Sequence, residues 1–138
     1  MMKLLVFVLS GAVLAVSCDS ATSIDALSET QGEWQLLEFA LSDGIVVQIP
    51  NPERYTVQFE VDGGINVGAD CNGCSGSYET SGNSIDINIM LCTAAACPPG
   101  SFSSEYVAAL DSASSFLRTS SELTLNSPGG SMNFRVSP

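Results

Sequence analysis

Four cysteines between residues 71 and 97 are the side chains of this sequence with the clearest capacity for chemistry. They are Cys71, Cys74, Cys92 and Cys97, in the spacing C-x2-C-x17-C-x4-C, and the first two are expected in a C-N-G-C turn. An even number of cysteines in an oxidising compartment predicts two disulfides. In a reducing cytosol, the same two close pairs could hold a zinc ion. The choice between these two interpretations therefore depends on the compartment.

A third interpretation, a redox-active C-x-x-C pair, is disfavoured by the residues that follow it. Such a pair needs its first thiol at the N-terminus of a helix, where the dipole lowers the thiol pKa. Here Cys74 is followed by SGSYE, which has the pattern of a strand. This argues against the redox interpretation, and we favour disulfides over zinc if the compartment is oxidising.

Other catalytic chemistry finds little support in the composition. The sequence has no histidine, and its only lysine is Lys3. This removes histidine-dependent triads, the commonest general base at neutral pH, and lysine chemistry in the mature chain. Paired carboxylates remain, but Asp62, Asp70, Glu79 and Asp86 fall in predicted turns or on predicted solvent faces. We predict that the protein is not an enzyme, with no catalytic residue, no metal site and no cofactor.

The first 17 residues identify the compartment. Lys3 precedes an apolar run over residues 4–16, and small residues lead to Cys18, which is the pattern of a signal peptide. The apolar run is too short for a comfortable membrane span. Residues 1–17 are therefore predicted to be a signal peptide, so the protein is exported and its cysteines are oxidised.

The end of this segment, LAVSC at residues 14–18, resembles a bacterial lipobox, although Ala15 stands where leucine is most usual. The resemblance implies that Cys18 becomes the mature N-terminus and carries acyl chains such as palmitate, which would anchor the lipoprotein to a membrane. The alternative is an ordinary secretory signal cut nearby. Lipidation of Cys18 would leave an even number of cysteines for disulfides. The expected location is the cell envelope, on the periplasmic or extracellular face.

Removal of residues 1–17 from the 138 leaves 121, enough for one domain. Residues 18–32 are small and polar and predict a flexible tether, and residues 33–138 are expected to form the domain. Three scattered arginines oppose 15 acidic residues in the mature chain, for a net charge of −12. Such a surface excludes nucleic-acid binding and favours a soluble monomer.

The hydropathy pattern of the domain is mainly that of β-strands. Alternation of apolar and polar residues between turn signals predicts strands at residues 33–40, 55–60, 65–69, 75–80, 85–89, 115–119, 122–126 and 132–136. Residues 41–54 contain two prolines and predict a loop or irregular edge with room for one short strand. One helix is expected after Pro98-Pro99-Gly100, with Phe102 and Tyr106 on its apolar stripe. The fold class is mainly β (α+β): a curved antiparallel sheet or partly closed barrel of seven to nine short strands, with one helix packed on it.

Several of these features together resemble the META domain (HslJ-like) family of small exported or lipid-anchored bacterial proteins. They include a strand that contains tryptophan, the run D-C-N-G-C-S-G-S-Y from Asp70, a cysteine after alanines, a helix and a final strand. The resemblance covers about residues 33–136; Thr93 to Cys97 lack the methionine usual in the family motif. It implies a curved sheet with a packed helix and no established enzyme activity. It also implies the disulfide pairing Cys71 with Cys97 and Cys74 with Cys92.

The function that this sequence favours is a non-enzymatic binding or envelope-stress module. The expected partner is an envelope protein or an apolar ligand, bound at an edge strand or at the mouth of the sheet beside the helix. Trp34, Tyr55 and Tyr106 are the candidate binding residues, with Phe39 and Phe102 as further aromatic candidates, although each also fits a place in the core. The alternatives are a small-molecule or metal-binding role and a passive structural surface lipoprotein.

Overall fold

The computed structural model describes residues 27–28 and 32–138. The expected signal peptide and Cys18 lie outside these residues, as does most of the expected tether. Nine strands, one short 3-10 helix and one α-helix are labelled in the described part: β1 (Trp34–Leu41), β2 (Val46–Gln48), η1 (Pro52–Arg54), β3 (Tyr55–Phe59), β4 (Gly64–Ala69), β5 (Asn72–Ser81), β6 (Ser84–Cys92), α2 (Ser103–Asp111), β7 (Ser115–Arg118), β8 (Glu122–Ser127) and β9 (Gly130–Val136).

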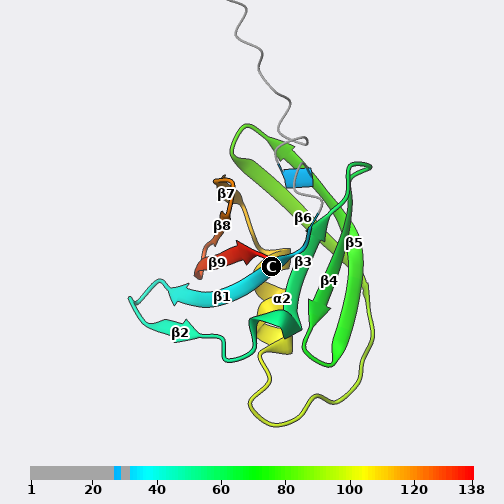
Figure 1. Cartoon of the computed structure of the whole chain (residues 1–138), viewed down its shortest axis with the longest axis vertical. Coiled ribbons are helices and arrows are strands. Elements are labelled where there is room, and N and C mark those ends of the chain that lie inside the picture. The colour runs from blue at the N-terminus through cyan, green and yellow to red at the C-terminus, as the bar shows by residue number, and fades with distance from the viewer. Residues whose placement is uncertain (1–26, 29–31) are drawn as a thin grey trace, which may run out of the picture.

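All nine strands belong to one antiparallel sheet in the order β2-β1-β3-β4-β5-β6-β7-β8-β9. β1 also pairs with β9 along most of its length, so the sheet closes on itself (Figure 1). The predicted curved sheet of seven to nine strands with one helix is thereby confirmed. The β3–β6 meander, the short strand within residues 41–54 and the three C-terminal strands all lie where the alternating pattern places them.

The β4–β5 turn differs from the sequence prediction. Ala69 pairs with Asn72, so the turn consists of Asp70 and Cys71 alone, and Asp70 adopts a positive φ of 59°. Cys74 already lies in β5, opposite Val67. The expected C-N-G-C turn that contained both cysteines is therefore wrong. Aspartate is one of the few residue types that tolerate a left-handed backbone, so Asp70 permits the tighter turn.

Alternate side chains of the strands fill the interior of the ring. Trp34, Leu36, Val57, Leu125 and Phe134 are among the most deeply buried. Burial of these large apolar groups is the main favourable contribution to folding such a sheet. Leu27 is also buried in this cluster, although it lies within the stretch expected to be a tether. The bounds of the tether and of the signal peptide stay predictions.

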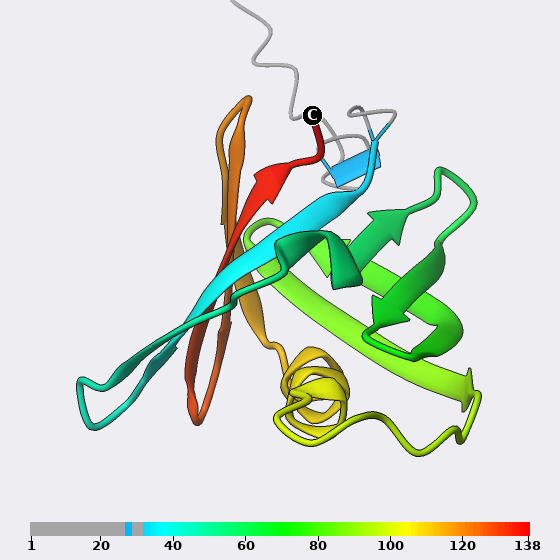
Figure 2. The same cartoon turned by 60° about the horizontal axis from the view of Figure 1, so that its bottom comes forward.

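Helix α2 covers one end of the ring, between the β8–β9 hairpin and the β5–β6 hairpin (Figure 2). Tyr106 and Leu110 on its inner face are fully buried. One edge of β6 pairs with β5, but along its other edge β6 shares only the pair Ser84 with Ser115 with β7. The helix lies beside this largely unpaired edge. The Asp111 carboxylate accepts a hydrogen bond from the Ile89 backbone N–H at 3.1 Å. The helix thus protects part of an otherwise open strand edge.

Within residues 27–28 and 32–138, no helix is both long enough and apolar enough to cross a membrane.

Candidate functional site

Two disulfides join the β4–β5 turn and strand β5 to the loop after β6 and to the last residue of β6. Cys71 is bonded to Cys97 and Cys74 to Cys92. This is the pairing that the family resemblance implies. All four sulfur atoms are occupied in S–S bonds, so none of them is a free thiolate for zinc or for redox exchange in this structure. Two disulfides fit an exported protein, because reducing compartments keep thiols free.

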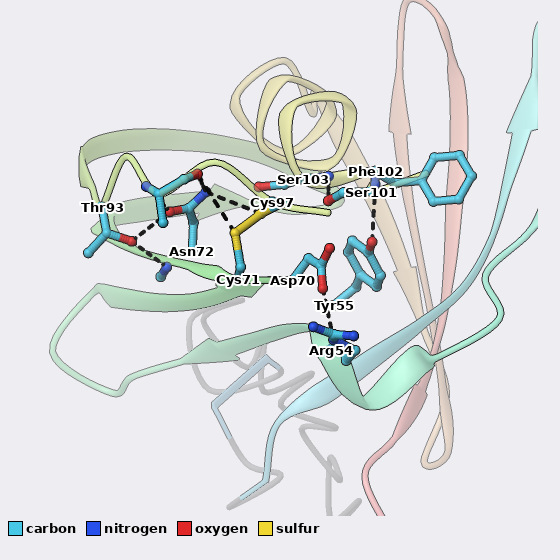
Figure 3. The surroundings of a disulfide bond; sticks show 12 residues. Arg54, Tyr55, Asp70, Cys71, Asn72, Thr93, Cys97, Ser101, Phe102 and Ser103 are labelled. Atoms are coloured by element: carbon cyan, nitrogen blue, oxygen red, sulfur yellow. Dashed lines mark hydrogen bonds and ion pairs between the residues drawn. A yellow bond between two sulfur atoms is a disulfide. The ribbon is translucent and has the colours of Figure 1, made fainter. Parts of the chain in front are cut away.

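The loop between β6 and α2, residues 93–102, is held to the sheet by Asn72 (Figure 3). The Asn72 amide nitrogen donates to the carbonyl oxygen of Ala95 at 3.0 Å, and its amide oxygen accepts from the Ala95 N–H at 2.8 Å. The same oxygen accepts from the Thr93 hydroxyl at 3.0 Å. The Asn72 side chain therefore pairs with both the N–H and the carbonyl of Ala95, as the backbone of a neighbouring strand would. The sequence did not indicate this role of Asn72, although its place next to Cys71 was visible.

Tyr55 fixes the other end of this loop. Its hydroxyl accepts a hydrogen bond from the Phe102 N–H at 3.0 Å, directly before α2 (Figure 3). Its ring packs edge-on against Tyr106, with 5.9 Å between the centroids. Beside it, the Arg54 guanidinium contacts the Asp70 carboxylate at 2.8 Å. Together with Asn72 and Cys97, Tyr55 sets the position at which α2 begins.

The helix positioned in this way forms one wall of an apolar groove of about 360 Å³. The opposite wall comes from β1, β2 and β9, which run past the helix at the end of the ring. The main apolar side chains of the groove are Phe39, Leu41, Val47, Phe102, Ala109 and Met132. Its volume falls within the range of about 300–1,000 Å³ usual for small-molecule sites. An apolar body of small-molecule size is therefore the kind of ligand that the groove can take.

Exposed apolar side chains extend the groove onto the β1–β2 hairpin. Leu41 at the end of β1 lines the groove and is 41% exposed, and Ile45 in the hairpin, which is 55% exposed, lies across from it. β2 is the outermost strand of the sheet. Large apolar groups gathered at an open site are a usual mark of a binding surface. The IVV run within an otherwise turn-rich segment was the available sequence signal for this patch.

A second cleft, of about 560 Å³, lies on the opposite side of α2. Its lining includes the polar groups Asn72, Thr93, Ser103 and Asp111. Asn72, Thr93 and Asp111 already make the hydrogen bonds that hold the loop and cover the β6 edge. We therefore take the apolar groove as the candidate site.

The three aromatic residues expected to bind a ligand lie inside the ring. Trp34 is 1% exposed, Tyr55 4% and Tyr106 0%. None of the three lines the groove, whereas the further candidates Phe39 and Phe102 do. Burial raises the pKa of the Tyr106 hydroxyl well above its ordinary value, and the negative charge of Glu33 adds to this shift. A direct binding role for Trp34, Tyr55 and Tyr106 stays a prediction.

Within the part of the chain that the structure describes, no group of three or more acidic or cysteine side chains is placed to hold a metal ion.

Comparison with known proteins finds one matching family and several structures with a similar fold. The profile of the META domain family matches residues 26–137. The NMR structure of a protein from Burkholderia xenovorans has a TM-score of 0.68 at 20% identity, and the match covers 83% of this chain and 86% of that one. No curated protein matches this chain.

Two crystal structures from Bacteroides are also similar. A DUF4847 family protein from Bacteroides vulgatus has a TM-score of 0.60 at 15% identity, over 81% of this chain and 96% of that one. A lipocalin-like protein from Bacteroides uniformis has a TM-score of 0.53 at 20% identity, over 75% of this chain and 94% of that one. At these identities the likeness concerns the fold alone.

Proposed function

The chain belongs to the META domain family, and from this premise we propose that it is a non-enzymatic binding domain of the cell envelope that takes apolar ligands in the groove beside α2. The observation that carries the proposal is the groove itself, with Phe39 and Phe102 in its lining and Leu41 at its exposed edge. Ligand pockets are mostly apolar, with few polar groups. The likeness in fold to a protein described as lipocalin-like is consistent with a binding role.

The absence of an enzymatic activity is part of this proposal. It is supported by a sequence without histidine. Among the described residues that line the groove, Glu105 is the only one with an ionisable side chain. One carboxylate without a second acid or base beside it is a poor basis for proton-transfer catalysis.

Attachment to a membrane through lipid on Cys18 also belongs to the proposal. It is supported by the LAVSC sequence at residues 14–18 and by the disulfides, which fit an exported chain. The partner is then an apolar ligand or an envelope protein that the anchored domain can reach. Nucleic acid is disfavoured by the net charge of −11 of the full chain.

Titration with the uncharged fluorophore N-phenyl-1-naphthylamine tests the proposed function. We expect saturable binding to the wild-type protein and about tenfold weaker binding to Leu41→Asp, because the carboxylate removes apolar contact and must be desolvated. Leu117→Asp is the matched control. Leu117 is also an exposed leucine of the sheet, at 70%, and it lies outside the groove lining.

Circular dichroism and thermal unfolding would verify that both variants are folded. A wild-type protein without saturable binding, or equal weakening in both variants, would overturn the proposed function.

A further inference from the structure

Among the described residues that line the groove, one side chain is charged, and it has no hydrogen-bond or ion-pair partner in the described part of the chain. Glu105 lies in the first turn of α2, is exposed, and lines the groove. Its carboxylate makes no hydrogen bond or ion pair within residues 27–28 and 32–138. Everything else in the lining is apolar, glycine or serine. A ligand that fills the groove therefore meets a mostly apolar surface with a single negative group at its edge.

The three arginines of the described chain are engaged elsewhere. Arg54 is paired with Asp70, and the Arg135 guanidinium donates to the Gln35 side-chain oxygen at 3.3 Å. Arg118 lies over the Trp34 ring, 5.8 Å from its centroid. None of these arginines lines the groove. The cation that would complement Glu105 is thus absent from this part of the chain and would come from the ligand.

Aromatic rings add to the attraction for a cation. Phe39 and Phe102 line the same groove as Glu105, with 6.3 Å between their ring centroids. The faces of aromatic rings attract ammonium groups, and this effect grows where water is excluded. The net charge of −11 of the full chain favours the approach of cations further.

We infer that the groove selects cationic amphiphiles: molecules with an apolar body that occupies the space between α2 and β1, and an ammonium group that pairs with Glu105. This inference rests on the proposed function, since it names the ligand class of the same groove. It predicts weaker binding of anionic amphiphiles of equal chain length, because their head group would face an unpaired carboxylate.

Three dodecyl compounds, used below the concentrations at which they form micelles, test the inference. They are dodecyltrimethylammonium, the uncharged tetraethylene glycol dodecyl ether and dodecanoate, each measured by displacement of N-phenyl-1-naphthylamine. We expect affinity to fall in that order, with the cation bound about threefold to fivefold more tightly than the uncharged ether, the range of an exposed ion pair.

Glu105→Gln should remove the preference for the cation and leave the affinity for the uncharged ether unchanged. Glu79→Gln is the control. It removes the same charge from an exposed position on β5 outside the groove lining, and should keep the preference. Equal affinities for the three compounds, or a preference that survives Glu105→Gln, would overturn the inference and leave the proposed function standing. Failure of the uncharged ether and the fluorophore to bind would overturn the proposed function, and the inference with it.

Discussion

Tyr106 places a hydroxyl in the interior of the sheet without a hydrogen-bond partner among the described residues. The residue is fully buried, and its ring packs against Tyr55 and Phe134. Desolvation by burial, followed by the charge of Glu33, raises the pKa of this hydroxyl. The ring therefore contributes apolar packing, while the hydroxyl makes the folded state sensitive to high pH.

The pH dependence follows from proton binding in the two states. An unfolded tyrosine ionises near pH 10, whereas folded Tyr106 keeps its proton, so the folded state binds more protons above about pH 10. This contribution to the free energy of unfolding is complete below pH 10. It is lost as pH rises above 10, by up to about 1.4 kcal/mol per pH unit.

We expect Tyr106→Phe to retain the wild-type free energy of unfolding at pH 7 within about 0.5 kcal/mol and to lose less stability between pH 9.5 and 11. Urea unfolding at each pH would measure this. Tyr55→Phe is the comparison, since it removes the acceptor of the Phe102 N–H and should cost about 1 kcal/mol at neutral pH. Parallel pH curves for wild type and Tyr106→Phe would contradict the prediction.

Among the elements, the loop over residues 93–102 has no regular secondary structure, yet it sets the position of α2. It begins after β6 and ends where α2 starts, so its course decides how far the helix stands from β1 and β9. The Cys71–Cys97 disulfide, the Asn72 side chain and the Tyr55 hydroxyl hold it from the sheet side (Figure 3). The groove therefore depends on contacts that lie outside its own lining.

Asn72→Ala tests this dependence. We expect a loss of about 1–2 kcal/mol in the free energy of unfolding with the disulfides intact, because the Ala95 N–H and carbonyl lose their partners. The amide of Ala95 should also exchange with solvent faster, which hydrogen exchange would show. Asn66→Ala is the control, because Asn66 is exposed and donates only to the Glu60 carboxylate at the surface. Equal losses in the two variants would count against a special role for Asn72.

At the scale of the whole molecule, the disulfides and the anionic surface fit a chain that works outside the cytosol. The sulfurs of Cys71, Cys74, Cys92 and Cys97 are consumed in pairs. Cys18, the fifth cysteine, lies outside the described residues, and the proposed lipid would occupy its thiol. One measurement on protein purified from its own membranes can test both the two disulfides and the lipid on Cys18.

Intact mass spectrometry before and after reduction would make that measurement. We expect alkylation of four cysteines only after reduction, together with a lipid mass on a chain that begins at Cys18. Alkylation of four thiols without reduction would contradict the disulfides. A chain that begins elsewhere without lipid would contradict the anchor and leave the binding domain unaffected.

The order of elements was legible in the sequence because most strands alternate between a buried and a more exposed face. Val57 and Phe59, or Ile85 and Ile87, are buried on one side as a period of two requires. Pro98 and Pro99 separate the last strand of the meander from the helix, since proline interrupts regular structure. Turn residues, apolar periodicity and the cysteine spacing therefore determined the fold class, the position of α2 and the capacity for disulfides.

The tertiary structure alone decided which aromatic residues line the groove and which lie wholly in the core. Periodicity assigns a side chain to a face of its strand or helix, but Phe39 and Trp34 both belong to β1. Phe39 lines the groove because it lies at the end of the closed sheet that α2 covers, whereas Trp34 lies in the core. The role of Asn72 likewise needs Ala95 beside it, 23 residues away in sequence. Long-range contacts of this kind depend on the closed sheet as a whole. The sequence could therefore suggest a site beside the helix, but no local pattern identified the residues that line the groove or placed the charge of Glu105 within it.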